Sequence, residues 1–434
     1  MAKEAKQRLA PIRQTVWMLL AALAHSSLAQ PAQAKNEPTN LADALLHDSE
    51  TTLQFRSHYL YRDKSRLADS LAWAGGGWLG YRSGWAGDRL RLGLTAYTSQ
   101  KLHGPADKDG ASLLLAGQRS YTMPGEAYAA LKLDDQIVTA GRFLVNRHEV
   151  NPQDTRMTPR TFQGVSLAGK VGDIDYFVAR LDKMKARNWD DFENVATVAG
   201  APAGVAEPLL LISLRGTPSE RLNLGFSSYR VRDVLASTYA DAAWLTPLDD
   251  HTGLRLNGQY MRQGSTGGKL LTGAAFNTAI IGFKADMIHG PLTLSGIAMQ
   301  TDRGAAYRMP FGSWAGYTSR IINNFNRAGE RVRAVDAVIN FAHLDVPGLI
   351  LTLSATSGNG AINAATGADL SQNAEYNLTA DYRFAAATWP QWVQPLWLRA
   401  RWGRFEQKLG GVVDATSEYH LILNYTVTLK SLFQ

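Results

Sequence analysis

Basic side chains recur at every second position within apolar stretches of the sequence. The clearest example reads LWLRAR, in which Arg399 and Arg401 alternate with Leu396, Leu398 and Ala400. In a β-strand, alternate side chains point to opposite faces, so the two guanidinium groups share one face. Guanidinium groups bind anionic oxygen atoms through strong, directed hydrogen bonds. The pattern fits a cationic track for anionic groups and equally wall residues that are paired with acids, rather than bond-making chemistry.

Other basic residues also stand opposite an apolar set. Two interpretations remain open for them: they are wall residues paired with acids such as Glu375, Asp381 or Glu418, or they extend the track. A ring of basic groups around a channel selects anions, provided that each group binds weakly enough to release them. These further candidates are Arg56, Arg89, Arg91, Arg255, Lys284, Arg383 and, on the polar face of the last segment, His420.

The sequence lacks the common catalytic motifs. G-x-S-x-G, H-E-x-x-H and the P-loop are absent, and the nine histidines occur singly. The chain has no cysteine, which excludes disulfides and thiolate metal sites. Residues 75–80, GGGWLG, match a dinucleotide motif, but they lie inside a strand-like segment with no helical pattern after it. We therefore predict no enzyme, no cofactor and no metal site.

The last segment, residues 418–429, shows which elements must position the basic residues. Apolar and aromatic side chains occupy its odd positions, and polar ones occupy its even positions except for Ile422. This period of two indicates a strand with one apolar face. A soluble barrel would bury that face, whereas a membrane barrel would turn it to lipid and line a wet lumen with the polar face.

The whole chain favours the membrane barrel. Short turns alternate with long polar connections, and no repeat of constant period suggests a propeller or a β-helix. The long connections are residues 100–125, 144–161, 185–207, 303–331 and 357–374. We predict an all-β transmembrane antiparallel barrel of about eighteen strands. The strand segments are 53–61, 70–81, 89–98, 126–133, 136–143, 162–170, 174–183, 208–216, 221–231, 238–245, 253–262, 277–288, 292–301, 333–343, 349–356, 375–384, 395–405 and 418–429.

The N-terminus has the features of a secretory signal, with a basic start, a short apolar run and a small-residue cleavage site. We divide the chain into a signal peptide (1–34), a short lead-in (35–50) and the barrel (51–434). The formal charge of the chain is +7, of which residues 1–34 contribute +3, so the mature chain carries only +4. This balance does not indicate a nucleic-acid partner. No apolar run reaches the roughly 18–20 residues that a spanning helix needs.

Aromatic residues gather toward the strand ends, as in the interface girdles of membrane barrels. We assign to these girdles Tyr59, Tyr61, Trp73, Trp78, Trp85, Trp402, Tyr419 and Tyr425.

The connection after the fifth strand contains two prolines, Pro152 and Pro159, which forbid a continuing strand or helix. We expect it to be an ordered loop. A barrel of sixteen to eighteen strands leaves an open aqueous pore unless such a loop folds in.

At these residues the chain resembles the OprD (porin D) family of substrate-selective outer-membrane porins. The family's loop signature is matched by Asp154, Arg156, Pro159, Thr161, Phe162 and Gly164. Further matches are PFGSW at 310–314, PGL at 347–349 and LWLRAR at 396–401. The closing pattern is matched by Leu421, Ile422 and Tyr425, with His420 where the family has arginine.

The resemblance implies a monomeric eighteen-stranded barrel in the outer membrane of a Gram-negative bacterium. Such a barrel contacts lipid and lipopolysaccharide and depends on the barrel assembly machinery during biogenesis. The third and seventh outer loops would narrow the pore, with Asp154, Arg156, Pro159, Thr161 and Phe162 in the constriction loop. A ladder of arginines would guide a substrate carboxylate. Arg399 and Arg401 match it directly, and His420 would make one rung absent or pH-dependent.

We therefore expect selective passive uptake of small anionic or zwitterionic solutes that bear a carboxylate, such as amino acids, aromatic acids or other organic acids. The alternatives are an unselective general-diffusion pore and a surface-loop enzyme or adhesin on a barrel scaffold. A soluble polysaccharide-binding β protein is a third alternative.

Overall fold

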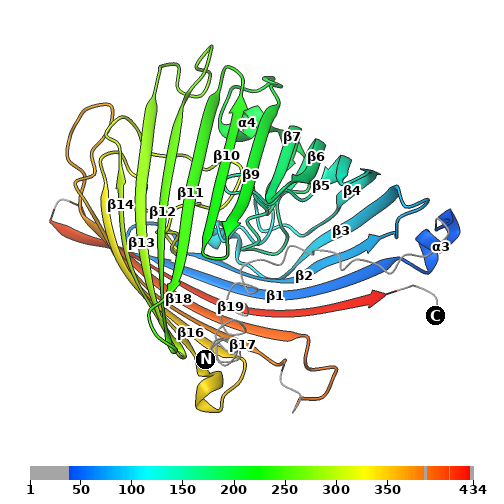
Figure 1. Ribbon diagram of the computed structural model, residues 1–434. Coiled ribbons are helices and arrows are strands. Elements are labelled where there is room, and N and C mark those ends of the chain that lie inside the picture. The colour runs from blue at the N-terminus through cyan, green and yellow to red at the C-terminus, as the bar shows by residue number, and fades with distance from the viewer. Residues whose placement is uncertain (1–38, 386–388, 410, 431–434) are drawn as a thin grey trace.

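The chain winds into a closed antiparallel β-barrel around a central lumen (Figure 1). The computed structural model describes residues 39–385, 389–409 and 411–430. The predicted signal peptide, residues 1–34, lies outside these residues. No helix in the described part of the chain is long and apolar enough to cross a membrane.

The described residues form nineteen strands, and eighteen of them make the barrel wall. In chain order the strands are β1 Glu50–Lys64, β2 Ser70–Arg82, β3 Leu90–His103, β4 Tyr121–Leu133, β5 Gln136–Phe143, β6 Thr161–Val171, β7 Ile174–Lys185, β8 Glu193–Asn194, β9 Leu209–Ser219, β10 Leu222–Val231, β11 Leu235–Pro247, β12 Thr252–Ser265, β13 Asn277–His289, β14 Leu292–Thr301, β15 Arg331–Asn340, β16 Leu349–Asn359, β17 Asn373–Arg383, β18 Leu396–Leu409 and β19 Val412–Lys430. β8 has two residues and pairs with the end of β7, outside the wall. The predicted number of wall strands is confirmed.

The wall closes because β1 pairs with strands from both ends of the chain. Tyr59 of β1 lies opposite Trp73 of β2 and opposite Leu421 of β19. Each wall strand runs antiparallel to both of its neighbours. No wall strand is left as an edge, which is what a sheet needs where no water can satisfy its backbone groups.

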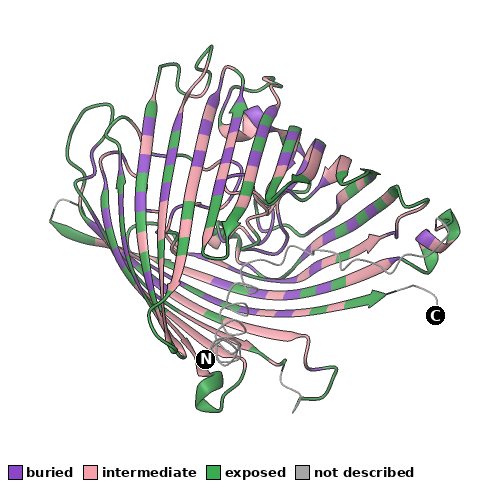
Figure 2. Ribbon diagram, viewed as in Figure 1, coloured by how far each residue is buried: buried purple, intermediate pink, exposed green. Residues whose placement is uncertain are grey.

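The apolar face of the wall points outward. In β19, Tyr419 and Leu421 are 43% and 51% exposed, whereas Glu418 and His420 are 0% and 4% exposed. Figure 2 shows the same alternation as buried and exposed bands along several other strands, for example β9 and β13. Apolar side chains outside and polar side chains around the lumen are the arrangement of a barrel that crosses lipid. The predicted orientation of the faces is confirmed.

Two tryptophans that were assigned to the outer girdles, Trp78 and Trp85, face the lumen instead. Trp73 is exposed on the outer face of β2. Trp78 stands five residues later, so it must point to the opposite face of the same strand. Its ring lies edge-on to the buried ring of Tyr97, with centroids 6.1 Å apart. Trp85, in the turn after β2, lies beneath the lumen residue Arg91.

Two long connections pack against the inside of the wall. Loop L3, residues 144–160, joins β5 to β6, and loop L7, residues 302–330, joins β14 to β15. Val150 of L3 and Phe311 of L7 are fully buried in one apolar cluster with wall residues. The short helix α4 (Val195–Ala199), between β8 and β9, adds its own buried side chains to this cluster. This burial fixes both loops against the inner face of the wall.

The short connections gather at the opposite end, which is the periplasmic end of outer-membrane barrels. The helix α3 (Leu41–Leu46) packs there against residues 83–89, the turn between β2 and β3. The carbonyl oxygen of the fully buried Ala44 accepts the N–H of Gly84 at 2.7 Å. A Cβ atom on Gly84 would lie 2.6 Å from the Cβ of Asp48, so glycine permits the close approach. The predicted lead-in is thus partly helical and holds this turn.

The strand ends differ from the prediction in two informative places. β4 begins at Tyr121, five residues earlier than predicted. Residues 121–125, which were predicted to belong to a loop, are therefore part of the wall. β15 ends at Asn340, where the prediction continued to residue 343. The side chain of Asn340 accepts the N–H of Ala342 at 3.0 Å and starts a 3₁₀ helix, η2 (Phe341–Leu344). Asparagine side chains compete with strand hydrogen bonding in this way.

The glycine-rich motif lies within β2, as predicted, and serves the wall. Gly76 and Gly77 have φ angles of +157° and +123°. A Cβ atom on Gly77 would lie 1.9 Å from the carbonyl oxygen of Gln54 on β1. Only glycine allows the two strands to approach so closely here.

Candidate functional site

L3, the predicted constriction loop, meets the wall at β1. Arg56, buried on the lumen face of β1, makes two hydrogen bonds to Asp154 of L3, from Nη1 to Oδ1 at 2.6 Å and from Nη2 to Oδ2 at 3.0 Å. Its Nε donates to Oδ1 of Asn424 at 2.7 Å, and Nη1 also donates to the carbonyl oxygen of Arg156. A guanidinium group engaged on all sides in this way anchors L3 to the wall.

Glu418 of β19 gathers basic side chains around a fully buried carboxylate. The Nε of Arg62 donates to its Oε2 at 2.6 Å, and Nη2 of Arg156 lies 3.8 Å from its Oε1. The Nε2 of His420 lies 2.6 Å from the same Oε1. The other ring nitrogen of His420 lies 3.0 Å from Nε2 of His58. His420 therefore bridges a carboxylate and a second histidine.

Arg399 and Arg401 share the lumen face of β18. Arg399 forms a two-point ion pair with Asp381, with Nε–Oδ1 at 2.7 Å and Nη2–Oδ2 at 3.0 Å. Arg401 lies opposite His420 in the register of β18 and β19. Its Nε is buried and has no hydrogen-bond partner among the described residues. Arg401 thus carries a donor that the fold leaves unused.

Arg255 of β12 and Lys284 of β13 form a separate group. They share the buried carboxylate of Asp286, at 2.8 Å from Nε and 3.1 Å from Nζ. Ser295 donates a further hydrogen bond to Asp286 at 2.6 Å. β12 is eight strands from β1 around the barrel. The structure therefore does not bring these two residues together with the arginines of the constriction.

The remaining predicted basic residues lie toward the periplasmic end. Arg91 is on the lumen face of β3, with its guanidinium carbon 4.1 Å from the centre of the Trp85 ring. Arg89 is exposed in the turn before β3. Arg383 is the last residue of β17 and is also exposed, with its guanidinium 4.5 Å from the centre of the Trp397 ring. None of these three contributes to the contacts of L3 with the wall.

Thr161 and Phe162, predicted in the constriction loop, are instead the first, fully buried residues of β6. Pro159 lies in L3, and its carbonyl oxygen accepts the ammonium group of Lys185 at 3.2 Å. Lys185 is fully buried and also donates to the hydroxyl of Thr158 at 2.8 Å. Sequence reasoning missed Lys185 because only the folded-in loop supplies its partners.

Sequence reasoning also missed Glu149, which lies where L3 meets L7. Its Oε1 accepts the hydroxyl of Tyr307 of L7 at 2.6 Å and that of Ser237 of β11 at 2.8 Å. Burial raises the pKa of Glu149 to about 7, although both hydrogen bonds act to lower it. This carboxyl group therefore changes its charge near neutral pH.

Further hydrogen bonds join the two loops. Oδ1 of Asn151 accepts the N–H and the hydroxyl of Ser313 at 2.8 and 3.0 Å. Nη1 of Arg160 donates to the carbonyl oxygen of Pro310 at 2.7 Å. Toward the other end of L7, the carboxylate of Glu375 accepts the backbone N–H groups of Ile322 and Asn323 at 2.9 and 2.8 Å. The loops therefore form one connected obstruction inside the barrel.

A second cationic surface lies across L3 from Arg56. A cavity of about 340 Å³ there is lined by Arg147 and His148 of L3, Arg215 of β9 and Asp154. Nη2 of Arg215 lies 3.4 Å from Nε2 of His148, which is 3.0 Å from Oδ1 of Asp241. The alternation of residues in the sequence of β9 places Arg215 on the lumen face. It gives no information on Arg147 and His148, because they lie in a loop. These groups can attract an anion as it passes the loops.

The chain matches the family model described as "outer membrane porin, OprD family" over residues 43–429. No curated protein matches the sequence.

Several solved structures share the fold. *Pseudomonas aeruginosa* OccK9 (OpdG) is 20% identical, over 89% of this chain and 100% of that chain, with a TM-score of 0.78. *Pseudomonas aeruginosa* OpdK with vanillate is 18% identical, over 89% and 100%, with a TM-score of 0.76. *Acinetobacter baumannii* OccAB2 is 20% identical, over 89% and 100%, with a TM-score of 0.79. At these identities the likeness establishes the architecture of the barrel.

Proposed function

Because this chain belongs to the OprD family of outer membrane porins, we propose that it is a passive channel that selects small water-soluble solutes bearing a carboxylate. Arg401, whose buried Nε lacks a partner among the residues that the structure describes, carries this proposal. A carboxylate that reaches the β18 wall can pair with the Arg401 guanidinium without displacing an acid of the protein. The solute crosses by diffusion, and no bond is made or broken.

The proposed ladder consists of Arg401 with Arg399 and Arg156 beside it. A guanidinium and a carboxylate about 4 Å apart attract by roughly 4 kcal/mol at an intermediate dielectric constant, before desolvation is subtracted. Desolvation and competition from Asp381 and Glu418 reduce that attraction. The net binding is then weak enough for release, which conduction requires.

His420 does not serve as a rung in this proposal. Its two ring nitrogens are occupied by Glu418 and His58, and its side chain is buried. The basic residues Arg89 and Arg383 are likewise left out, because they are exposed at the periplasmic end. The path of the carboxylate therefore follows β18 and L3.

Replacement of both Arg399 and Arg401 with alanine tests the proposal. We expect the uptake of carboxylates by a porin-depleted host to fall far more than the conductance of the purified channel for small ions. An equal fall in both would contradict the ladder, because it would indicate a general change in the pore.

A general-diffusion pore is the second candidate. The pairing of Arg56 with Asp154 and of Arg399 with Asp381 favours it, since paired charges attract anions only weakly. Reversal potentials in mixed salts distinguish the two candidates, because an unselective pore passes ions in proportion to their mobility.

The barrel of this family lies in the Gram-negative outer membrane, so its outer face contacts lipid. Contact with lipopolysaccharide, use of the barrel assembly machinery and a monomeric state are further parts of the proposal.

A further inference from the structure

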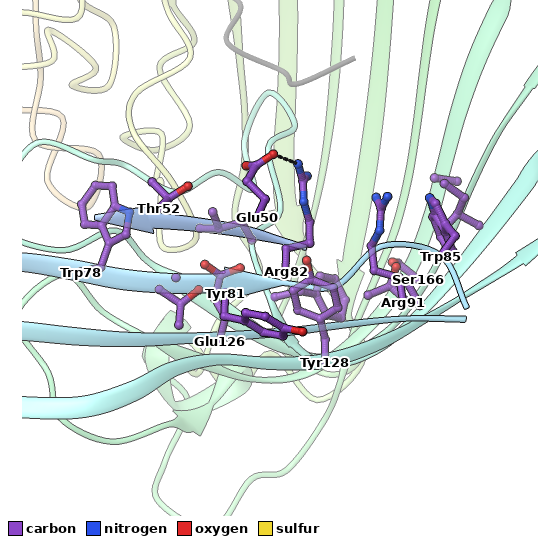
Figure 3. Close-up of a pocket in the computed structure, with 18 of the residues that line it drawn as sticks. Glu50, Thr52, Trp78, Tyr81, Arg82, Trp85, Arg91, Glu126, Tyr128 and Ser166 are labelled. Carbon is purple, nitrogen blue, oxygen red and sulfur yellow. Dashed lines mark hydrogen bonds and ion pairs between the residues drawn. The ribbon is translucent and has the colours of Figure 1, made fainter. Parts of the chain in front are cut away.

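A separate cavity of about 480 Å³ lies at the periplasmic end of the lumen, bounded by β1 to β7. Figure 3 shows its labelled side chains pointing into a shared space from several strands. Its walls combine aromatic rings with two arginines and two glutamates. The side chains on which the argument depends are Trp78, Trp85, Tyr128, Arg91, Arg82 and Glu126.

The two arginines of this cavity differ in their pairing. Arg82 is joined to Glu50 by an ion pair of 3.0 Å, drawn as the dashed line in Figure 3. Arg91 has no such partner, and its buried Nε has no hydrogen bond within the described residues. Its guanidinium instead stacks 4.1 Å from the centre of the Trp85 ring. Among the described residues the Arg91 guanidinium therefore has no acid partner, and it can pair with an anion beside an aromatic face.

The aromatic surfaces are fixed in place by the backbone. The Tyr128 ring lies against Gly93, where an added Cβ atom would come within 2.3 Å of the ring. Trp85 belongs to the turn on which α3 packs, and the neighbouring N–H of Ala86 donates to the carbonyl oxygen of Leu90 at 2.8 Å. Rings held in this way can stack a planar ligand at little cost in ordering.

The acidic side chains of the cavity already have partners. Glu50 is paired with Arg82, and Glu126 accepts the hydroxyl of Tyr97 at 3.1 Å. A ligand with an ammonium group would have to compete for these carboxylates. A ligand with a carboxylate and an apolar ring finds both a free donor and fixed aromatic faces.

We propose that this cavity is a second binding station, on the periplasmic side of the loops, for a single-ring aromatic monocarboxylate. The carboxylate accepts hydrogen bonds from Arg91, and the ring stacks at the same end of the cavity, beside Trp85 and Tyr128. The volume falls in the range of about 300–1,000 Å³ found for small-ligand sites. The assignment rests on the proposed function, which brings carboxylates to this point, and names the class of carboxylate that is retained longest.

The test uses the folded mature protein in detergent micelles and 4-fluorobenzoate as the probe, with binding followed by ¹⁹F NMR line broadening. Because Arg401 is itself a proposed site, the background is the Arg401→Gln variant. Adding Arg91→Gln to this background should weaken binding by about tenfold, the loss expected for one charge-assisted hydrogen bond. Adding Arg91→Lys should recover part of the affinity.

Arg89→Gln is the matched control, because it removes the same charge from the same turn region at an exposed position outside the cavity. In the Arg401→Gln background it should change the affinity less than about twofold, as expected for an exposed charge. Heat-modifiable gel migration confirms that each variant is folded.

The aromatic part of the site has its own test. Trp85→Leu should weaken 4-fluorobenzoate binding about fivefold, in the range for an aromatic pair. The same change should weaken the binding of a fluorinated cyclohexanecarboxylate by a smaller factor, since that ring has no aromatic face to stack and loses only the support that Trp85 gives to Arg91.

Equal affinities with and without Arg91→Gln would overturn the site, and so would an equal effect of Arg89→Gln. A failure of the proposed function appears elsewhere, as carboxylate uptake that does not depend on Arg399 and Arg401. The two failures are therefore distinguishable.

Discussion

Two parts of the lumen wall carry basic residues of the same strand parity but differ in how these residues are paired. On β12 and β13, Arg255 and Lys284 share one buried carboxylate, Asp286. On β18, Arg401 keeps a buried Nε that has no partner in the described part of the chain, next to the paired Arg399. A paired guanidinium must release its own acid before it can hold a solute. The position of a basic residue in the strand alternation thus determines which face of the wall it occupies. The acids around it determine whether it can bind a solute.

The largest expected effect contrasts the two walls directly. Arg401→Gln should reduce the uptake of benzoate into proteoliposomes about tenfold or more, as expected for loss of a charge-assisted hydrogen bond. Arg255→Gln should reduce it less than about twofold, because this arginine is already neutralised and its pair is worth little to a passing anion.

Both variants remove one positive charge from the lumen face, so each is the control for the other. Conductance in potassium chloride and heat-modifiable migration verify an intact barrel. Equal losses of benzoate uptake would show that total charge, rather than the unpaired donor, governs passage.

Much of this architecture could be predicted from the sequence. Alternation identified each of the eighteen wall strands and assigned the faces of β18 and β19. It also placed Arg399 and Arg401 on one face, because a period of two is a property of the strand alone. The same rule applied to Trp73 and Trp78, five residues apart, would have placed Trp78 inside the barrel. The error arose because Trp78 was assigned to the girdle from its aromatic type and not from its position in the strand alternation.

The contacts inside the lumen could not be predicted in the same way. Glu149 and Lys185 acquire their roles only when L3 folds back against the wall and L7. The ion pair between Arg56 and Asp154 joins residues far apart in the sequence. The unpaired state of Arg91 depends on the neighbouring Arg82 having taken Glu50. Such pairings depend on height and distance across the barrel, which alternation does not encode.

The next effect concerns Glu418, the carboxylate that neutralises the constriction wall. Glu418→Gln should raise the permeability of chloride relative to potassium about threefold, the size of a change of roughly 0.5–1 kcal/mol for a partly screened charge. The reason is that Arg62 and Arg156 lose their anionic partner while remaining in the lumen. Reversal potentials across a potassium chloride gradient measure the ratio.

An unchanged ratio in Glu418→Gln would mean that these arginines do not sense the permeating ion. Because removing one member of a buried ion pair is destabilising, the variant should also unfold at a lower temperature. That change is measured separately and does not affect the interpretation of the ratio.

Loops pack on both walls, because L3 is anchored to β1 and L7 packs on β12 and β13, and pH should report on Glu149, where the two loops meet. Burial raises the pKa of Glu149 from 4.5 to about 7. Between these values the folded chain keeps a proton that the unfolded chain has released. Stability is therefore lost as pH rises from about 4.5 to about 7, by roughly 3 kcal/mol at about 1.4 kcal/mol per pKa unit.

Thermal unfolding of the micellar barrel between pH 5 and pH 8 measures this loss. The midpoint of the natural protein should fall by a few degrees across that range, since roughly 1 kcal/mol shifts a large chain by about 2–4 °C or less. Glu149→Gln should show a flatter profile because its side chain cannot ionise. Parallel profiles for the two proteins would contradict the role given to Glu149.

The smallest effect should come from removing the shared acid of the β12–β13 wall, so that its basic residues become unpaired as Arg401 is on β18. Asp286→Asn leaves Arg255 and Lys284 without their shared carboxylate. We expect the preference for anions over cations to rise about twofold, within the range for a few tenths of a kcal/mol. The reversal potential in potassium chloride reports it, and a fall in anion preference would contradict the comparison.

The central claim is that an unpaired arginine makes the channel prefer carboxylates, and a bi-ionic measurement tests it most directly. With sodium benzoate on one side of a planar bilayer and sodium chloride on the other, the reversal potential gives the permeability ratio of the two anions. We predict that benzoate is favoured relative to its mobility in water in the natural protein, and that Arg401→Gln removes this preference. A ratio equal to the mobility ratio in both proteins would contradict the claim.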